Sequence, residues 1–372
     1  MNYIFYQTKT KFSNTGDALI NKAFIDILRS YGNLKCNCSK DISNKFINEL
    51  GIRESEKLIC DSEISFSIAI LKKAIKTFFK KDKVFLFSGL GHIYSTKKDK
   101  SKILKNILAG FIFLIYRMFG IKIIRIGFTI GPISKGLAIS EFFRSIFISD
   151  YYVRDTQSLE LCHKIGIKKA KLCPDLSWVY LMNTNRELNV KKDIAINLKC
   201  SVLSEKDENY INNIISRCEQ ILNLIQKYYN EDIKIKFMYQ VADDKEFCIK
   251  LYNHFKDIYH CKYIDKQMDL SDANKYFQNV SINISNRMHS LLLGYKYGAL
   301  PLALVDIKNH IKISQTFKDC KIDNLLVDVY SKDDKEIIYI LENMQSEFDN
   351  LIEVEKLKQK EIKKVLDEVI NK

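Results

Sequence analysis

The sequence predicts a protein of two α/β domains, each built on a parallel β-sheet with helices on both faces. Its 372 residues are long for one ordinary domain and sufficient for two. Short apolar runs alternate with amphipathic segments throughout, and the alternation restarts after a polar stretch at residues 182–193. Because helix-length crossovers between strands favour parallel pairing, we expect two such units facing a cleft.

The apolar runs of the first half predict four strands, and the amphipathic segments between them predict three helices. The strands are expected at residues 2–6, 84–87, 121–126 and 151–153. The helices are expected at about residues 17–30, 101–119 and 154–165. These elements make up a Rossmann-like N-terminal domain, residues 1–180.

The second half repeats the pattern and predicts a Rossmann-like C-terminal domain, residues 190–331. Its strands are expected at residues 194–198, 233–238, 280–284 and 300–305. Its helices are expected at about residues 205–229, 243–256 and 286–297. The polar stretch at residues 182–193 is the expected linker.

The tail, residues 332–372, is expected to form a C-terminal helix. Apolar residues recur there every three to four positions, at Leu341, Met344, Phe348 and Leu351. We interpret this pattern as a helix that packs back on the first domain. A helix that pairs with a coiled-coil partner is the alternative.

Positive charge is concentrated in one segment. The net charge is +14, and residues 72–105 contribute +9 of it, with eleven lysines against two acids. A solvated face is one reading; the other is docking on an anionic inner leaflet, where each lysine contributes ~1 kcal/mol. No nucleic-acid partner is expected, because no helix-turn-helix, RNP-type or zinc pattern accompanies the lysines. The uncharged segment at residues 107–116 beside them is expected to be a buried crossover helix.

The cysteine spacing and the N-terminal residues indicate the cellular compartment of the protein. The ten cysteines are unevenly spaced and do not resemble a secreted disulfide framework. Cys36 and Cys38 form a single Cys-x-Cys motif, and no second cysteine pair follows at the spacing of a zinc site. No metal or cofactor is therefore expected. The start of the chain lacks a signal-peptide apolar core. We therefore expect a cytoplasmic protein, or one peripheral on the inner face of the cytoplasmic membrane.

Two polar clusters follow strands or open helices in the first domain, where ligands of open parallel sheets bind. Asn14, Gly16 and Asp17 open the first helix, and Asp17 is a natural N-cap, so plain capping and ligand contact are both open. After strand 84–87, Gly89 and Gly91 allow close approach of backbone N–H groups to an anion or sugar. His92 adds a group that exchanges protons near neutral pH, although glycine turns after strands are common.

A third cluster joins Arg154, Asp155 and Ser158 with the following Asp175. An arginine at a strand end can clamp a carboxylate or phosphate in bidentate fashion. The alternative is that Arg154 pairs with Asp155 or Asp175 and only stabilises the turn.

The fourth cluster is residues 285–290, Ser-Asn-Arg-Met-His-Ser, between a strand and an apolar helix. Arg287 and His289 lie at a helix N-terminus, where the dipole and free N–H groups favour an anion. This arrangement fits anion binding together with proton transfer. A core histidine with a satisfied partner is the alternative.

Taken in order, these clusters resemble the motifs of the polysaccharide pyruvyl transferase family. Residues 126–132, Ile-Gly-Phe-Thr-Ile-Gly-Pro, and a Gly-x-x-Pro-Leu at residues 298–302 complete the resemblance, which covers about residues 13–305. It implies a GT-B-like fold and transfer of an enolpyruvyl-derived group from phosphoenolpyruvate to a sugar. The product would be a pyruvate ketal on a cell-surface polysaccharide precursor, an exopolysaccharide or capsule component.

The resemblance also implies roles for individual residues. Arg154 and Arg287 would cradle the phosphate and carboxylate of the donor, and His289 would be the general acid. Asp17, Asp175 and His92 would compete for the acceptor side. The remaining residues expected to bind substrate are Asn14, Gly16, Gly89, Gly91 and Ser290.

Two other functions remain open from sequence. One is a nucleotide-sugar glycosyltransferase of the same architecture, with Asp306 on the ribose of the nucleotide. The other is a basic polyanion binder without enzymatic activity. The glycosyltransferase differs from a pyruvyl transferase in its donor, a nucleotide sugar in place of phosphoenolpyruvate. A steep salt dependence of DNA binding would indicate the polyanion binder.

Overall fold

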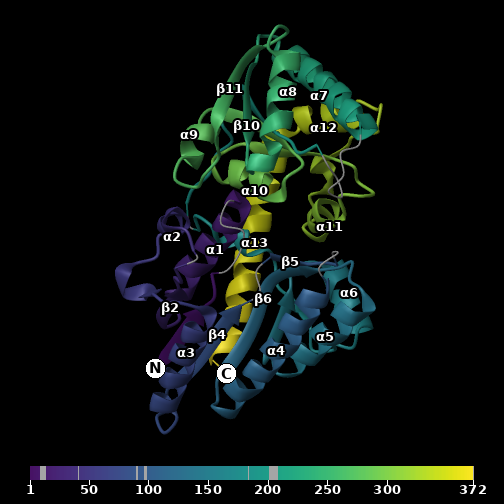
Figure 1. Cartoon of the computed structure of the whole chain (residues 1–372). Coiled ribbons are helices and arrows are strands. Elements are labelled where there is room, and N and C mark those ends of the chain that lie inside the picture. Colours follow the sequence, from purple (N-terminus) through teal and green to yellow (C-terminus); the bar gives the residue numbers. More distant parts are fainter. Residues whose placement is uncertain are drawn as a thin grey trace. The chain divides into compact units, whose positions relative to one another are not determined.

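The structure is a computed structural model that describes residues 1–8, 14–40, 42–88, 91–95, 99–182, 184–200 and 208–371. The chain forms two compact units (Figure 1). Unit 1 comprises Met1–Phe12, Ile20–Tyr180 and Lys358–Lys372, and unit 2 comprises Ser13–Leu19 and Leu181–Leu357. The predicted fold class, two parallel-sheet α/β units with a C-terminal helix, is confirmed.

The sheet of unit 1 is parallel throughout its described strands. Its strands are β1 (Asn2–Tyr6), β2 (Asn33–Asn37), β3 (Lys57–Leu58), β4 (Lys83–Ser88), β5 (Gly91–Ile93), β6 (Lys122–Ile130), β7 (Asp150–Val153) and β8 (Lys171–Leu172). The order is β3-β2-β1-β4-β6-β7-β8, with β5 paired to β6. The direction of chain progression reverses between β1 and β4, as in a doubly wound fold.

Helices cover both faces of this sheet. They are α1 (Thr15–Leu28), α2 (Asn44–Glu49), α3 (Glu63–Thr77), α4 (Asp99–Met118), α5 (Lys135–Ile146) and α6 (Thr156–Lys164). Right-handed crossovers place α3 to α6 on one face and the part of α1 within unit 1 on the other. Helices α4 and α5 pack side by side (Figure 1).

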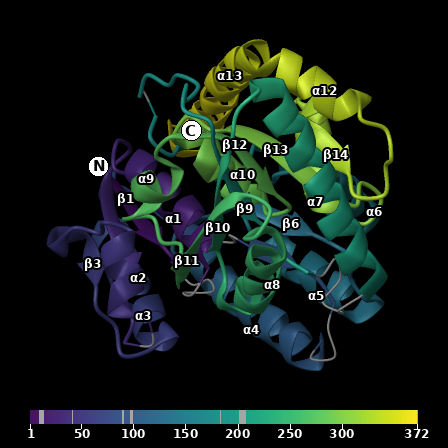
Figure 2. The same ribbon diagram turned by 90° about the horizontal axis from the view of Figure 1, so that it is seen from above.

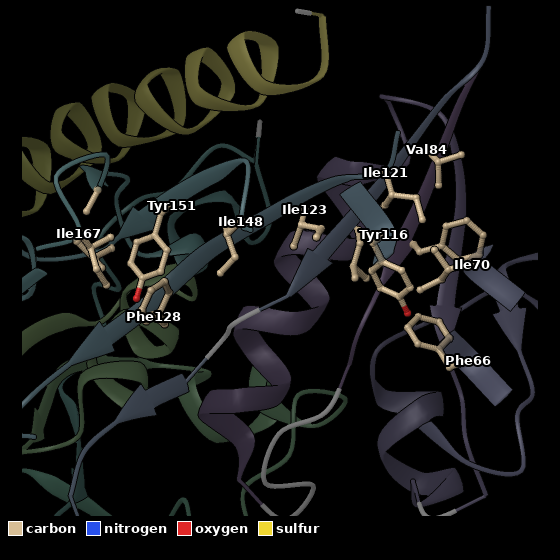
Figure 3. Close-up of a cluster of buried hydrophobic side chains, with 14 of the residues drawn as sticks. Phe66, Ile70, Val84, Tyr116, Ile121, Ile123, Phe128, Ile148, Tyr151 and Ile167 are labelled. Atoms are coloured by element: carbon tan, nitrogen blue, oxygen red, sulfur yellow. The ribbon is translucent and has the colours of Figure 1, made fainter. Parts of the chain in front are cut away.

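A continuous apolar core lies between the sheet and α3 and α4. Phe66 and Ile70 of α3 pack near Tyr116 of α4, Val84 of β4 and Ile121 (Figure 3). All five side chains are at most 4% exposed. Burial of this apolar surface is the main force that holds these helices on the sheet.

The sheet of unit 2 repeats the topology with six parallel strands. They are β9 (Asp193–Asn197), β10 (Lys234–Tyr239), β11 (His260–Gln267), β12 (Val280–Ser285), β13 (Leu300–Val305) and β14 (Leu326–Asp328). The order is β11-β10-β9-β12-β13-β14, so the reversal of direction lies between β9 and β12. The carboxyl ends of these two strands therefore define the expected ligand-binding edge.

The helices of unit 2 follow the same scheme. They are α7 (Glu208–Tyr229), α8 (Lys245–Phe255), α9 (Ala273–Phe277), α10 (Met288–Lys296), α11 (Ile311–Asp319), α12 (Lys335–Glu342) and α13 (Met344–Asn371). Helix α12 packs against α7, as Figures 1 and 2 both show. Helix α13 contributes its residues up to Leu357 to unit 2 and those from Lys358 to unit 1.

The structure corrects two predictions about helices. The tail was expected to be one helix, but α12 ends at Glu342 and α13 begins at Met344. Residues 107–116 were expected to form a buried crossover helix, but this part of α4 is largely exposed, with only Gly110 and Tyr116 buried. A helix on a sheet buries one side of its circumference, and an uncharged sequence does not reveal which side that is.

Among the described residues, no helix combines the length and the apolar character needed to cross a bilayer.

Candidate functional site

The carboxyl edge of the unit 2 sheet gathers polar side chains where β9 and β12 end. Asn197 is the last residue of β9, and Ser285 is the last residue of β12. The Ser285 hydroxyl donates a hydrogen bond of 2.5 Å to the Asn197 carbonyl and accepts one of 3.0 Å from the Arg287 N–H. These bonds join the two strand ends and direct the chain from β12 into α10.

Helix α10 begins at this edge, and Arg287 is its N-cap residue with extended backbone angles. The first helical bond runs from the Leu291 N–H to the Arg287 carbonyl, at 3.1 Å. The N–H groups of the first turn, at Met288, His289 and Ser290, therefore lie at the positive end of the helix dipole. Such a helix start, placed at a sheet edge, favours an anionic ligand.

Gly16 of α1 packs directly against the imidazole of His289. A Cβ atom on Gly16 would lie 2.5 Å from Nδ1 of His289 and 2.7 Å from Nε2 of Gln240. Real side chains do not approach so closely, so this position accommodates glycine alone without displacement of its neighbours. Glycine at this position allows the α1 backbone to approach the histidine closely. The φ angle of Gly16 lies outside the left-handed region, so backbone conformation does not require glycine here.

Asn14 caps α1, which corrects the prediction that Asp17 is the N-cap. The Asn14 side-chain oxygen accepts a hydrogen bond of 3.0 Å from the Gly16 N–H and another of 3.0 Å from Gln240 Nε2. The helix begins at Thr15, which places Asp17 within the first turn, where its carboxylate accepts a bond of 3.3 Å from Asn14 Nδ2. The sequence did not show that the helix starts two residues before Asp17.

Hydrogen bonds also join the start of α1 to the residues that follow β10 and β11. The Thr15 hydroxyl donates to the Gln240 carbonyl at 3.3 Å and to the Met268 carbonyl. Gln240 follows β10 directly, and Met268 follows β11. Asn14, Gly16 and Asp17 thus belong to unit 2, and Gly16 is the one shown to pack on His289.

Positive charge is concentrated next to the start of α10. Arg287 forms an ion pair with Asp244, which is 4% exposed, and Lys199 lies close enough to influence both. Burial, and after it the Arg287 guanidinium, lower the pKa of Lys199 to about 8, against the opposing effect of Asp244. Burial raises the pKa of Asp244, and its pairing with Arg287 opposes that rise. Arg287 and Lys199 thus supply two cations near the one carboxylate of Asp244, and the excess positive charge suits an anion.

The Lys199 backbone is fixed in place by Asn286. The Lys199 N–H donates to Asn286 Oδ1 at 2.8 Å, and Asn286 Nδ2 donates to the Lys199 carbonyl at 3.0 Å. Asn286 Nδ2 also lies 3.2 Å from the Tyr210 hydroxyl. The motif at residues 285–290 thereby positions the lysine that follows β9.

Several buried polar atoms at this edge have no hydrogen-bond partner among the described residues. Both side-chain polar atoms of Asn197 belong to this set, although the residue is 0% exposed. The others are Oε1 of Gln240, Oδ2 of Asp244, Nε of Arg287 and Oγ of Ser290. Buried polar groups are normally paired, so a concentration of such atoms at a strand edge is typical of a site that binds a polar ligand.

The carboxyl edge of unit 1 holds the other predicted arginine in a closed network. Arg154 Nη1 donates to Asp175 at 2.8 Å, and Nε donates to the Thr129 hydroxyl at 2.6 Å. Asp175 also accepts from the Ser177 N–H at 2.9 Å. Of the two readings open from sequence, the structure contains the pairing of Arg154 with Asp175; a role of either residue in substrate binding stays a prediction.

His92 lies at the same edge of unit 1. It belongs to β5, opposite Thr129 of β6, and its Nε2 is 2.6 Å from the Gly131 carbonyl. Gly91 has a φ of +107°, which favours glycine. Gly89 lies outside the described residues, so its predicted role has no structural account. The structure thus groups His92, Arg154 and Asp175 in unit 1.

The predicted site residues fall into these two groups. Unit 2 holds Asn14, Gly16, Asp17, Arg287, His289 and Ser290. Sequence reasoning missed Asn197, Lys199, Gln240 and Asp244, although each ends or closely follows β9 or β10, where the same rule of strand ends applies. Within the described part of the chain, no cluster of three or more His, Cys, Asp or Glu side chains is suited to a metal ion.

Comparison with known proteins gives a family and a fold. A family model described as polysaccharide pyruvyl transferase matches residues 14–299. A search of curated proteins gives no match.

Solved structures show the fold. Anabaena HepE in complex with UDP is 8% identical with a TM-score of 0.57, and the match covers 100% of both chains. A putative UDP-N-acetylglucosamine 2-epimerase from Listeria monocytogenes is 8% identical with a TM-score of 0.54, over 94% of this chain and 90% of that one. Phytolacca americana UGT2, complexed with UDP-2-fluoro-glucose and pterostilbene, is 7% identical with a TM-score of 0.50, over 99% of this chain and 100% of that one. At these identities the likeness indicates the GT-B fold alone.

Proposed function

The chain belongs to the polysaccharide pyruvyl transferase family, and from this premise we propose that it transfers a pyruvyl group from phosphoenolpyruvate to two hydroxyl groups of a sugar. Family membership makes the protein a transferase that acts on polysaccharide. The donor, the ketal product and a lipid-linked saccharide as acceptor are the parts that we propose. No nucleic acid is proposed as a partner.

The observation that carries this proposal is the grouping of Arg287, Lys199 and His289 at the start of α10. Phosphoenolpyruvate carries a phosphate and a carboxylate, so it needs cations and N–H donors together. Two cations near one carboxylate, beside a helix N-terminus, supply both. The unpaired polar atoms of Asn197 and Ser290 add further groups that can contact the donor.

His289 is the proposed general acid. Protonation of the donor methylene carbon would create a positive centre at C2, which a sugar hydroxyl attacks. Phosphate then leaves with the electrons of its C–O bond, and a second hydroxyl closes the ketal; each hydroxyl loses its proton. Gly16 is proposed to support this role for His289, because its backbone packs directly on the imidazole.

Residues of both units are proposed to contact the acceptor sugar or to act as the base. Asn14, Gly16 and Asp17 are proposed to contact the sugar, because Asn14 is hydrogen-bonded to Gln240 and Gly16 packs on His289. Arg154 and Asp175 remain proposed substrate contacts, and His92 remains a proposed base. Each attacking hydroxyl must give its proton to a base, and we propose Asp17 for this role because its carboxylate lies in the first turn of α1, one residue after Gly16.

Ligand-dependent thermal stabilisation tests the donor without knowledge of the acceptor. Saturation at a hundredfold the dissociation constant raises stability by about 2.7 kcal/mol. We expect phosphoenolpyruvate to raise the melting temperature of the wild-type protein, and the Arg287→Ala variant to lose this shift. The matched control is Lys262→Ala, which removes an exposed cation from β11 and should retain the shift.

Substitution of His289 distinguishes donor binding from turnover. His289→Ala should keep the donor-induced shift and lose turnover, measured as phosphate release once an acceptor is found. Wild-type turnover in His289→Ala would overturn its role as general acid. A shift produced by a nucleotide sugar and not by phosphoenolpyruvate would instead identify a glycosyltransferase of the same fold.

A further inference from the structure

Helix α4 exposes an apolar stripe on its outer side. The stripe consists of Leu104, Leu108, Phe111, Ile115 and Met118, which recur at intervals of four and three residues. All five are exposed, and Met118 is 71% exposed. A helix on the surface of a globular protein normally presents polar residues on this side. We call these five residues the α4 stripe.

The orientation of the stripe follows from packing on the opposite side of α4. Asn106 Nδ2 donates to Ser140 Oγ at 3.2 Å and lies 3.3 Å from Glu141 Oε2, both on α5. A Cβ atom on Gly110 would lie 2.6 Å from the ring of Phe143, so α5 approaches the α4 backbone closely there. Because Asn106 and Gly110 face α5, the five residues of the α4 stripe lie on the outer side of the helix.

The neighbouring helices continue the apolar surface. Tyr116 of α4 lies in the same buried apolar cluster as Phe66 and Ile70 of α3, and the rings of Phe111 and Phe143 lie 5.6 Å apart between α4 and α5. Exposed apolar residues on α3, on α5 and just after α3 are Ile64, Ile68, Ile75, Phe78, Phe79, Ile139, Phe142 and Ile146. Many exposed apolar side chains on neighbouring helices are typical of an interaction site.

Exposed charge on α3, α4 and α5 is almost entirely positive. Glu63 is the exposed acid of these helices. The exposed cations are Lys72, Lys76, Lys100, Lys105, Arg117 and Lys135. An apolar surface bordered by cations is complementary to a partner whose outer layer is negatively charged and whose interior is apolar.

We propose that the outer surface of α3, α4 and α5 docks on an anionic lipid bilayer. The α4 stripe enters the boundary between headgroups and acyl chains, and the lysines contact the headgroup phosphates. A second copy of the chain fits this surface less well, because a two-fold contact would bring its cations against one another. A nucleic acid would use the cations but leave the apolar stripe without a partner.

This surface is independent of the donor site, so the inference does not rest on the proposed function. It complements a lipid-linked acceptor, because docking would hold the protein at the membrane that carries such a substrate. It also involves a helix that the sequence led us to expect to be buried.

Vesicle flotation tests the inference with the full chain and no substrate. We expect the protein to float with vesicles of phosphatidylcholine and phosphatidylglycerol and to remain unbound with phosphatidylcholine alone. Leu108→Ser/Phe111→Ser/Ile115→Ser should weaken binding by about tenfold or more. The matched control is Val190→Ser/Ile258→Ser/Leu357→Ser, which alters three apolar residues of unit 2 that are at least as exposed as Phe111 and should bind as wild type.

Charge is tested separately. Lys72→Gln/Lys76→Gln should weaken binding by about fivefold per lysine, and raised salt should have the same effect. Unchanged melting temperatures would show that the exposed substitutions leave the fold intact. A donor-induced thermal shift that persists in the stripe variant separates this proposal from the proposed function.

Two results would overturn the inference. One is a wild-type protein that does not float with anionic vesicles, or a stripe variant that floats equally well. The other is a dimer in solution that the stripe variant abolishes, which would make the surface a contact between copies of the chain.

Discussion

Gly16 and His289 are in such close contact that a methyl group on Gly16 would lie 2.5 Å from Nδ1 of the imidazole. The two residues come from distant parts of the chain, one at the start of α1 and the other in the first turn of α10. Their contact joins two motifs that were recognised separately in the sequence. It also makes glycine at this position a requirement of the histidine's geometry.

Gly16→Ala is therefore predicted to impair turnover more than donor binding. The added methyl group must displace His289 or Gln240, and a displacement of about 1 Å at a reacting group costs about a hundredfold in rate. Steady-state kinetics would show this loss in kcat, and the donor-induced thermal shift should remain.

Gly136→Ala is the matched control for this substitution. The new Cβ atom would meet only the terminal carbon of the flexible Ile103 side chain, at 2.8 Å, on α5 away from the site. This variant should keep full activity. Equal activity in both alanine variants would mean that the contact between Gly16 and His289 does not position the imidazole.

Lys199 predicts a pH dependence of donor binding. Its pKa is lowered to about 8, first by burial and then by Arg287, while Asp244 and Cys200 act in the opposite direction. An anion binds the protonated form better, so donor affinity should be highest below about pH 8 and fall as the pH rises above it. Dissociation constants measured from pH 7 to 9.5 test the direction.

Two variants isolate the lysine. Lys199→Arg should bind the donor with little change across this range, because a guanidinium does not lose its proton there. Lys199→Met should bind weakly at every pH. A wild-type affinity that is constant across the range would exclude Lys199 from the donor site.

The pairing of Arg154 with Asp175 predicts a stability cost in unit 1. Both side chains are 3% exposed, and removal of the arginine would leave the Asp175 carboxylate buried without its cation. Arg154→Ala should therefore lower the free energy of unfolding by about 3–5 kcal/mol. Urea denaturation without ligand measures the change.

Arg53→Ala serves as the comparison for Arg154→Ala. Arg53 is 70% exposed and lies 3.9 Å from Glu56, so its loss should cost less than about 1 kcal/mol. If the two variants are equally stable, the buried pair does not stabilise unit 1. A folded Arg154→Lys variant that loses the donor-induced shift would add a binding role to the structural one.

Local sequence patterns predicted most of the central strands and their helices. Strand β1 was predicted at residues 2–6, and the structure has Asn2–Tyr6. Strands β4, β6, β7, β9, β10, β12 and β13 were also predicted, because their apolar runs are continuous. Strand β11 was missed, since His260–Gln267 is rich in charge and lies at the edge of the sheet. Edge strands are buried less and so carry a weaker apolar signal.

The site was predicted only in part, for a related reason. Arg287 and His289 could be identified because a strand, a polar turn and an apolar helix follow one another in the sequence. Lys199 and Asp244 also follow strands, but nothing else in the sequence beside them distinguished them. Their importance comes from burial and from their proximity to Arg287, which are properties of the folded chain.

The sequence by itself determined the alternation of strands and helices, the repeat of the α/β pattern and the motif that opens α10. These are local properties, set by periodicity and by the residues that follow each strand. The tertiary structure alone decided that the start of α1 lies against His289 and that the α4 stripe faces outward. Both depend on which surfaces pack together, and an apolar segment or a helix cap does not specify its partner.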